Sequence, residues 1–218
     1  CHFLHKNLLR QLLPILLFLM EFKESLVKAG EIARKAREYA KEITKENVKY
    51  LEIAEKVEKK ISDLGGKCAF PVDVSVNYIA AHDTPLHNDE RVLVKGDLVK
   101  IDLGVHVDGY VADTAVTVEV SSNINQKLME ASESALKEAA KLAVPGAEIG
   151  EIGKKIQEEI TKFGFTPIKN LCGHGTKQYQ GHTEPTIPNY NNGDKTKLKE
   201  GMIIAIEPFA TTGQGLIT

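Results

Sequence analysis

The residues of this sequence that are best suited to chemistry begin with two aspartates, Asp102 and Asp113, in a valine-rich segment. Between them, Asp108-Gly109 separates two runs of alternating apolar residues, a strong signal for a two-residue β-hairpin turn. Counting outward from that turn pairs Gly104 with Asp113. Because side chains alternate along a strand, Asp102 shares the face of Gly104, so the two aspartates are diagonal neighbours about 7–8 Å apart. We expect Gly104 to leave the space opposite Asp113 empty.

Two carboxylates held this close repel each other, and a bound cation would remove that cost. The alternative is that both are hydrated on an exposed face, which is the usual fate of aspartate. The neighbouring residues favour a sheet with a buried face, because they are branched and apolar: Val99, Ile101, Leu103, Val105, Val116 and Val118. The aspartate pair therefore predicts a metal site.

A second group of candidates lies in a glycine-rich segment, where His174 and His182 stand eight residues apart. In a single extended chain, an even separation puts both side chains on the same side. Three glycines in the segment, Gly173, Gly175 and Gly181, argue against a helix. A histidine is more often a hydrogen-bonded core or surface residue than a metal ligand. Two histidines in a glycine-rich segment strengthen the metal-ligand interpretation only moderately.

Glu207 and His82 complete the candidates. Glu207 ends an apolar, strand-like run over residues 202–206, and Pro208 favours an extended conformation at Glu207. Metal binding or proton transfer explains a glutamate in that position better than hydration does. His82 stands just before a turn at Thr84-Pro85 and, on its own, is typical of a loop residue.

The elements that must position these residues follow a simple order. Periodicity predicts helices over residues 21–43, 47–63, 123–143 and 148–163, and extended segments over residues 72–76, 98–105, 110–120, 165–170 and 202–206. The order of helix, helix and strands occurs twice, which predicts two similar α/β halves over residues 21–120 and 121–218. A site built from both halves would lie at their junction.

Composition limits the class of protein. The chain has 218 residues with 42% hydrophobic and 27% charged side chains, which is typical of a globular protein. A net charge of −2 gives no reason to expect nucleic acid as a partner. The three cysteines, Cys1, Cys68 and Cys172, are few and widely spaced, so we expect reduced thiols and a cytoplasmic location.

The first nineteen residues differ from the rest. Lys6 and Arg10 precede an apolar run over residues 12–20, as in a signal peptide, but no small-residue cleavage site follows. The run is also shorter than the ~20 residues of a membrane span. We interpret residues 1–19 as an apolar extension, with Met20 as the natural start. A genuine targeting or anchoring segment is the alternative, and it alone would imply a membrane partner.

Four motifs together resemble a known family. They are AAHDTP, IDLGVHVDGYVADTA, the segment GHGTKQY with its following GH, and AIEPFATTGQG. In order and spacing they are similar to the methionine aminopeptidases, which have the α/β (α+β) pita-bread fold also found in creatinase. The resemblance covers nearly all of residues 20–218. AIEPFAT and the Lys-Gln-Tyr after the first histidine look more like type 2, in its short archaeal form, than type 1.

The resemblance implies a role for each candidate. Asp102, Asp113, His174 and Glu207 look like ligands of two divalent ions of Co, Mn, Fe or Zn, with Asp113 in a bridging position. Glu207 would also handle the proton of the attacking water.

The remaining roles concern the substrate. His82 and His182 resemble the two histidines that hold the substrate carbonyl and the peptide nitrogen, and Phe70 resembles an aromatic wall of the methionine pocket. The implied function is removal of the N-terminal methionine from nascent chains, at the ribosome, by a cytoplasmic monomer.

This sequence departs from the family pattern in two ways. The family has a fifth ligand, a second glutamate on a late strand, but residues 208–218 contain no Asp or Glu. We therefore expect residues 20–218 to be an incomplete, C-terminally truncated catalytic domain that binds one metal weakly and is inactive alone. The family also usually carries a branched apolar residue where this chain has Gly181, which alters the expected pocket.

Two other functions on the same fold stay open. A peptidase of the Xaa-Pro aminopeptidase or prolidase kind would share the metal ligands, but its His-Glu-x-Pro pattern is only approximated by His182-Thr183-Glu184-Pro185. A non-catalytic binding protein on the pita-bread scaffold would have lost metal ligands, whereas four candidates are present here.

Overall fold

The computed structural model describes residues 24–218. The predictions about residues 1–19 and about Met20 fall outside the described residues. The described chain begins with a helix over residues 24–43, in agreement with the helical periodicity predicted for that stretch. Among the helices of residues 24–218, none is both long and apolar enough to cross a membrane.

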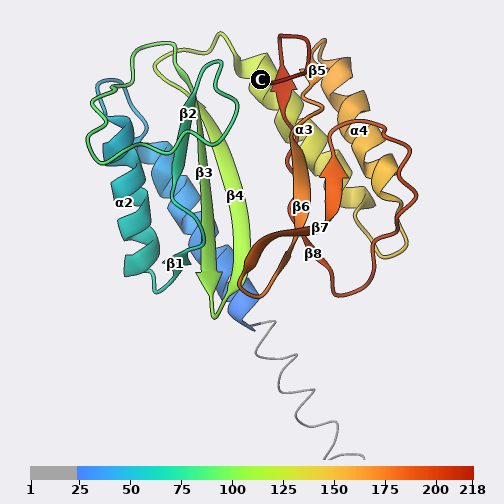
Figure 1. The fold of residues 1–218 in the computed structure, drawn as a ribbon. Coiled ribbons are helices and arrows are strands. Elements are labelled where there is room, and N and C mark those ends of the chain that lie inside the picture. The colour runs from blue at the N-terminus through green and yellow to red at the C-terminus, as the bar shows by residue number, and fades with distance from the viewer. Residues whose placement is uncertain (1–23) are drawn as a thin grey trace, which may run out of the picture.

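The first half of the described chain packs two helices against an antiparallel sheet (Figure 1). Helix 24–43 is followed by α2 (Tyr50–Asp63). The strands are β1 (Lys67–Cys68), β2 (Asp73–Val76), β3 (Leu98–Val107) and β4 (Tyr110–Glu119). β3 is the central strand, because it pairs with β1, β2 and β4.

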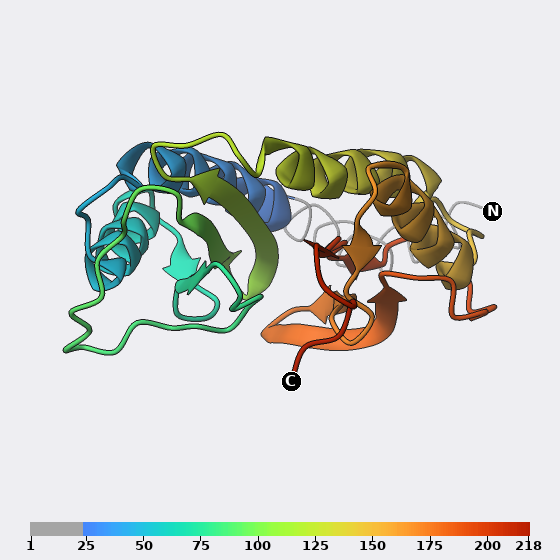
Figure 2. The ribbon, with the colours of Figure 1, turned by 90° about the horizontal axis from the view of Figure 1, so that it is seen from above.

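The second half repeats the helix–helix–strand order with shorter strands. Its helices are α3 (Gln126–Leu142) and α4 (Ile149–Lys162). Its strands are β5 (Thr166–Pro167), β6 (Cys172–Lys177), β7 (Gln180–Pro188), β8 (Ile203–Ile204) and β9 (Ala210–Thr211). They form a β7-β6-β8 sheet and a separate β5-β9 pair. From above, helix 24–43 and α3 run along one side of the molecule, with the strands of both halves on the other (Figure 2).

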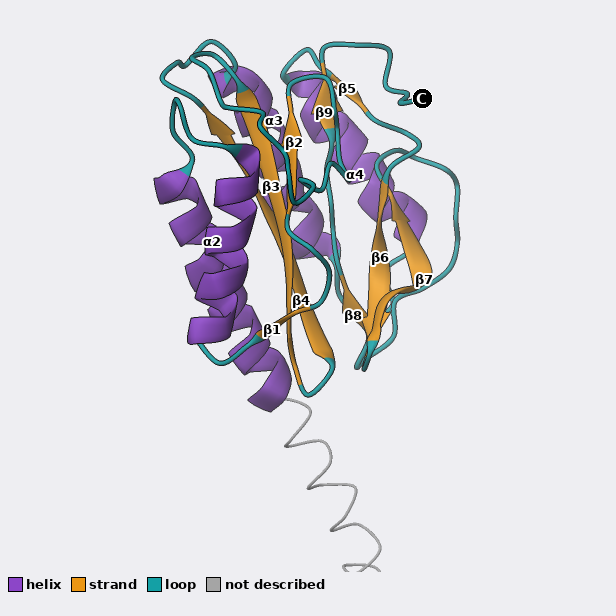
Figure 3. Ribbon diagram, turned by 60° about the vertical axis from the view of Figure 1, so that its left-hand side comes forward, coloured by secondary structure: helices purple, strands orange, loops and turns teal. Residues whose placement is uncertain are grey.

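The two halves meet where β4 of the first contacts β6 of the second (Figure 1). Figure 3 shows the strands of both halves from another side. The two hairpin turns are also joined directly, since the backbone N–H of Tyr179 donates to the carbonyl of Gly109 at 2.8 Å. The side-chain amide of Gln178 donates to the carbonyl of Asp108, also at 2.8 Å. The junction therefore brings residues from both hairpins together, as the sequence predicts for the site.

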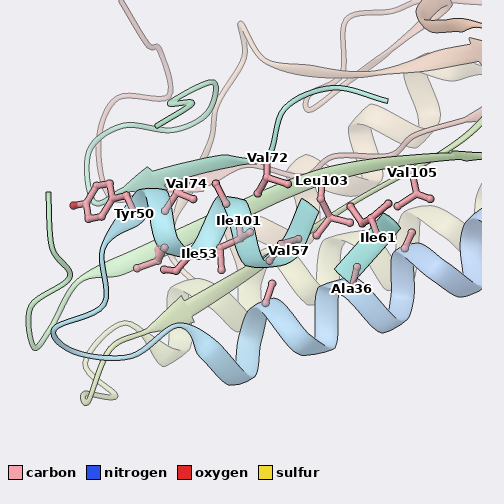
Figure 4. Packing of buried hydrophobic residues seen from close by; sticks show 14 of the residues in the cluster. Ala36, Tyr50, Ile53, Val57, Ile61, Val72, Val74, Ile101, Leu103 and Val105 are labelled. Atoms are coloured by element: carbon pink, nitrogen blue, oxygen red, sulfur yellow. The ribbon is translucent and has the colours of Figure 1, made fainter. Parts of the chain in front are cut away.

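The first-half core explains why β3 presents a polar face to the junction. Its residues Val99, Ile101, Leu103 and Val105 are completely buried, together with side chains of helix 24–43 and α2 such as Ala36, Ile53, Val57 and Ile61 (Figure 4). Each branched side chain buried in this way contributes about 1.5–3 kcal/mol. Because side chains alternate, fixing the odd-numbered residues against the helices leaves Asp102 and Gly104 on the opposite face.

Most predicted elements are confirmed, and the main omission is in the second half. The helix predicted over residues 47–63 begins at Tyr50, and the extended segment predicted over residues 165–170 is reduced to the two residues of β5. The β6–β7 hairpin was not predicted as a hairpin. Its turn, Gln178-Tyr179, lacks the glycine or asparagine that marks most two-residue turns.

Candidate metal centre

The β3–β4 hairpin places the two aspartates as predicted. Val107 pairs with Tyr110 around the turn, Gly104 pairs with Asp113, and Asp102 pairs with the residue two positions beyond Asp113. The turn itself needs a left-handed backbone, with φ of 52° at Asp108 and 84° at Gly109. Asp102 and Asp113 are therefore diagonal neighbours on the face opposite the helices.

The space beside Gly104 is not empty, which corrects the expectation from sequence. A Cβ atom at Gly104 would clash with the ring of Phe70 and would lie 3.0 Å from the Cβ of Ala69. Glycine is required because the Phe70 ring packs directly over this position. Phe70 therefore lies next to the strand position that faces Asp113, on the face that carries both aspartates.

Glycines also determine how closely other strands approach β6. A Cβ atom at Gly173 would clash with the carbonyl oxygen of Ala205, and one at Gly175 would clash with that of Glu184. The β6–β7 pairing shifts register on either side of Gly175. His174, which is only 9% exposed, is thus held between two close backbone approaches.

Three candidate ligands from three segments converge. Nε2 of His174 lies 3.0 Å from Oε1 of Glu207 and 3.5 Å from Oδ2 of Asp113. Donor atoms of these three residues all lie within 4.8 Å of one another, which is the spacing of a group that could hold a metal ion. They come from β4, β6 and the segment after β8, so both halves contribute to the group.

Electrostatics at His174 favour a cation in this group. Nδ1 of His174 lies 3.1 Å from the carbonyl oxygen of Gly175, and a carbonyl can only accept, so Nδ1 carries a proton. In the neutral ring the lone pair of Nε2 then faces the carboxylate oxygens of Asp113 and Glu207. Hydrogen bonding to Asp113 and Glu207 raises the pKa of His174 to about 10. A proton or a metal ion at Nε2 would relieve the same clash of lone pairs.

The carboxylates give a second indication. Burial, followed by the negative charges of Asp113, Glu207 and Asp73, raises the pKa of Asp102 to about 8. Among the described residues, Oδ1 of Asp102 is a buried side-chain oxygen without a hydrogen-bond partner, and so is Oε1 of Glu207 when Nε2 of His174 carries no proton. Unpartnered buried carboxylate oxygens are costly unless a cation binds them. The residues present therefore fit a divalent metal, although Asp102 lies outside the compact three-residue group.

His182 lies beside this group, but for a reason other than the one predicted. The ring centroids of His174 and His182 are 4.3 Å apart. The two histidines do not belong to one extended chain, as their even spacing suggested, because a turn at Gln178-Tyr179 separates them. They lie on the paired strands β6 and β7.

Glu207 and His82 lie outside regular strands. β8 ends at Ile204, so Glu207 does not end a strand as predicted. The backbone pairing nevertheless continues past β8, because His174 and Ala205 exchange two backbone hydrogen bonds of 3.2 and 2.7 Å. His82 is in the loop between β2 and β3, with a left-handed φ of 63°.

Sequence reasoning missed Asp73. This residue is 6% exposed and pairs across the ladder with Asp102. It accepts a short hydrogen bond from the hydroxyl of Thr84, in the loop that carries His82. The available signal was an aspartate between valines in a predicted strand.

Comparison with known proteins agrees with this geometry. The model of metallopeptidase family M24 matches residues 24–217. The methionine aminopeptidase of Pyrococcus horikoshii is 51% identical over 195 residues, covering 89% of this chain and 66% of that protein. That of Methanothermus fervidus is 44% identical over 187 residues, covering 80% of this chain and 100% of that protein. The chain thus spans just under two thirds of the Pyrococcus relative.

Solved structures confirm the α/β pita-bread fold. The crystal structure of methionine aminopeptidase from Thermotoga maritima has a TM-score of 0.81 and 30% sequence identity, covering 88% of this chain and 80% of that one. The prolidase from Pyrococcus horikoshii has a TM-score of 0.74 and 33% identity, covering 86% and 54% respectively. The sequence match over residues 24–217 and the converging ligand group lead to the same conclusion. The chain belongs to metallopeptidase family M24.

Proposed function

We propose that this protein is a methionine aminopeptidase of type 2, which removes the N-terminal methionine from nascent chains by metal-assisted hydrolysis. The observation that carries the proposal is the convergence of Asp113, His174 and Glu207 in a group that could hold a metal. Identity of 44–52% to archaeal methionine aminopeptidases supports the choice of substrate within the family.

The proposed ligands are Asp102, Asp113, His174 and Glu207, holding two ions of Co, Mn, Fe or Zn. Carboxylate oxygens and one imidazole suit any of these metals. The bound ions would supply Lewis acidity, which polarises a peptide carbonyl and lowers the pKa of water.

The other candidate residues would act on the substrate. His182 would donate a hydrogen bond to a peptide carbonyl beside the metal group, and the packing of its ring against that of His174 supports this role. Glu207, which has one buried carboxylate oxygen, would accept the proton of the attacking water. His82 would hold the peptide nitrogen, and the Phe70 ring over Gly104 would form one wall of the methionine pocket.

Selectivity for methionine would depend on shape as well as on apolar character. An apolar pocket alone discriminates by about 1–3 kcal/mol per methylene. The Phe70 ring, packed against the backbone of β3 at Gly104, would form one wall of such a pocket. We also propose, from the resemblance, that the protein acts as a monomer in the cytoplasm and meets its substrates at the ribosome.

The test is release of methionine from Met-Ala-Ser by the full-length gene product. We expect release with Mn, Co or Zn, loss of release after treatment with a chelator, and recovery when metal is restored. A peptide with an acetylated N-terminus should resist cleavage, because an aminopeptidase needs a free amine. Cleavage of Xaa-Pro dipeptides without methionine release would instead support the prolidase-like alternative.

A further inference from the structure

The long loop between β2 and β3, residues 77–97, holds His82 in an unusual conformation. Its φ of 63° is in the left-handed region, which residues other than glycine rarely adopt. Such a conformation is strained and persists only where the surroundings enforce it. Within the described chain, no hydrogen bond or ion pair involves the His82 ring. Its orientation therefore depends on how the backbone around it is fixed.

The backbone just after His82 is attached to β2. The N–H of Val74 donates to the carbonyl of Asp83 at 2.9 Å, and the N–H of Asp83 donates to Oγ of Ser75 at 3.3 Å. The hydroxyl of Thr84 donates to Asp73, which pairs with Asp102 across the ladder. These bonds connect the His82 loop to the strand beside a proposed metal ligand.

Arg91 holds Asp83 in place through its side chain. Its guanidinium donates two hydrogen bonds to the Asp83 carboxylate, Nη1 to Oδ2 at 2.7 Å and Nη2 to Oδ1 at 2.9 Å. This two-pronged geometry is directional as well as strong. The Asp83 side chain is 16% exposed and that of Arg91 is 44% exposed, so solvent partly screens the charges and the geometry of the pair matters more than its electrostatic strength.

Arg91 is itself held in place. It also donates to Asp89, with Nη2 to Oδ2 at 2.6 Å, and its guanidinium carbon lies 4.7 Å from the centre of the Tyr50 ring. The N–H of Tyr50, the first residue of α2, donates to the backbone carbonyl of Arg91. The Arg91 side chain, which binds the Asp83 carboxylate, is thus anchored to the helical layer of the first half.

We propose that the Asp83–Arg91 ion pair is a positioning device that keeps His82 in its left-handed conformation and so aims its imidazole at the substrate. The inference rests on the proposed function, in which His82 holds the peptide nitrogen. Neither Asp83 nor Arg91 belongs to the metal group, so the proposal assigns their effect to His82. Loosening the pair should therefore lower kcat while leaving metal binding intact.

The test compares Asp83→Asn and Arg91→Lys with the matched control Glu90→Gln. Asp83→Asn removes the charge with little change of shape, and Arg91→Lys removes the planar fork while keeping a positive charge. Glu90 lies on the same loop as Asp83 and Arg91, and Glu90→Gln breaks its exposed ion pair with Lys49. Misplacing a catalytic group by 1 Å costs about 100-fold in rate. We expect kcat for Met-Ala-Ser to fall roughly 10-fold or more in both test variants, and to stay within about twofold in the control.

The decisive measurement repeats both variants in a His82→Ala background. If the pair acts through His82, Asp83→Asn and Arg91→Lys should have almost no further effect there, because the group they position is gone. Calorimetric binding of Mn should match wild type in all variants, and the melting temperature identifies any global loss of structure.

Five outcomes would overturn either the positioning proposal or the function on which it rests. Losses that multiply in the His82→Ala background, or weaker Mn binding, would mean a general structural role and reject the positioning proposal. So would unchanged kcat in both test variants. If wild type releases no methionine, the proposed function fails instead. If His82→Ala is nearly as active as wild type, the proposed role of His82 fails.

Discussion

The β3–β4 and β6–β7 hairpins contribute different ligands and are built differently. β3 and β4 pair without interruption from Leu98 with Glu119 to Val107 with Tyr110. β6 and β7 share only a short ladder with register shifts on either side of Gly175. A regular ladder fixes the separation of two carboxylates, whereas an irregular one lets His174 turn toward them. The comparison indicates that the first hairpin sets the spacing of its carboxylates by regular pairing, whereas the second positions His174 by an irregular ladder and close backbone packing.

The largest effect is expected when a proposed metal ligand is removed from the regular β3–β4 hairpin. Asp113→Ala deletes the carboxylate that lies 3.5 Å from His174. Loss of an outer-shell partner alone costs about 10–100-fold in metal affinity or activity. For a direct ligand we therefore expect methionine release to fall by more than about 100-fold, with weaker Mn binding in calorimetry.

The control for this prediction is Asp108→Asn in the same hairpin. It removes one negative charge at the turn while keeping a residue type that tolerates the left-handed φ of 52°. Its activity and metal binding should match those of wild type. Near-normal turnover of Asp113→Ala would reject the account in which this residue binds metal.

The same contrast explains how much of the site could be predicted. The position of Asp113 relative to Asp102 follows from Asp108-Gly109 and from alternation, because both are local rules. The meeting of His174 with His182 follows from no local rule. Their turn includes Tyr179, a bulky residue at φ 58°, which its contact with Gly109 in the other hairpin stabilises.

Other features depend on neighbours that are distant in sequence. In the sequence, the glycines of β6 indicate only that the segment is not helical. In the structure, Gly173 and Gly175 permit close backbone approaches by Ala205 and Glu184. The empty space predicted at Gly104 is filled by Phe70, from a segment before β2. The amino-acid pattern identifies candidate ligands well, but it cannot show which side chain fills a gap in a remote strand.

The second prediction concerns the irregular β6–β7 hairpin. Gly173→Ala places a methyl group against the backbone carbonyl of Ala205, which cannot move without breaking the pairing with His174. Overpacking of this kind costs about 1–3 kcal/mol. We expect a lower free energy of unfolding in urea and weaker metal binding, because His174 is displaced.

Gly181→Ala is the matched control in the partner strand, since a Cβ atom there meets nothing within 4 Å. Its free energy of unfolding should lie within about 0.5 kcal/mol of wild type. Equal effects of the two substitutions would mean that close backbone approach does not distinguish these positions. The open space at Gly181 also predicts that a larger residue can be introduced there without disturbing β7.

The third prediction tests the contact between the regular hairpin and the proposed pocket. Gly104→Ala should push the Phe70 ring away and destabilise the protein by about 1–3 kcal/mol. In a Phe70→Ala background the same substitution should cost much less, because the clashing ring is absent. Measured by urea unfolding, an equal cost in both backgrounds would contradict the packing of Phe70 on Gly104. A raised KM for Met-Ala-Ser in Gly104→Ala would support the role of Phe70 as a pocket wall.

The smallest effect concerns Glu119, at the end of β4, where the chain passes from one half to the other. Its carboxylate accepts hydrogen bonds of 2.9 Å from the backbone N–H groups of Ile124 and Asn125, just before α3 begins. Burial tends to raise the pKa of Glu119. Hydrogen bonds from Asn125, Ser122 and Ile124 outweigh that tendency and hold the pKa below its ordinary value of 4.5.

Because the folded pKa is lowered, the ionised carboxylate stabilises the protein above about pH 4.5, and this contribution is lost as the pH falls through the folded pKa. Glu119→Gln should therefore lower the free energy of unfolding by at most about 1 kcal/mol at neutral pH. The gap from wild type should narrow as the pH falls from neutral through the lowered pKa of Glu119, below which both side chains are neutral. Urea unfolding across that range measures it, with the exposed helical Glu133→Gln as the charge control. A gap that stays constant with pH would mean that the link between the halves depends on the shape of residue 119 instead of its charge.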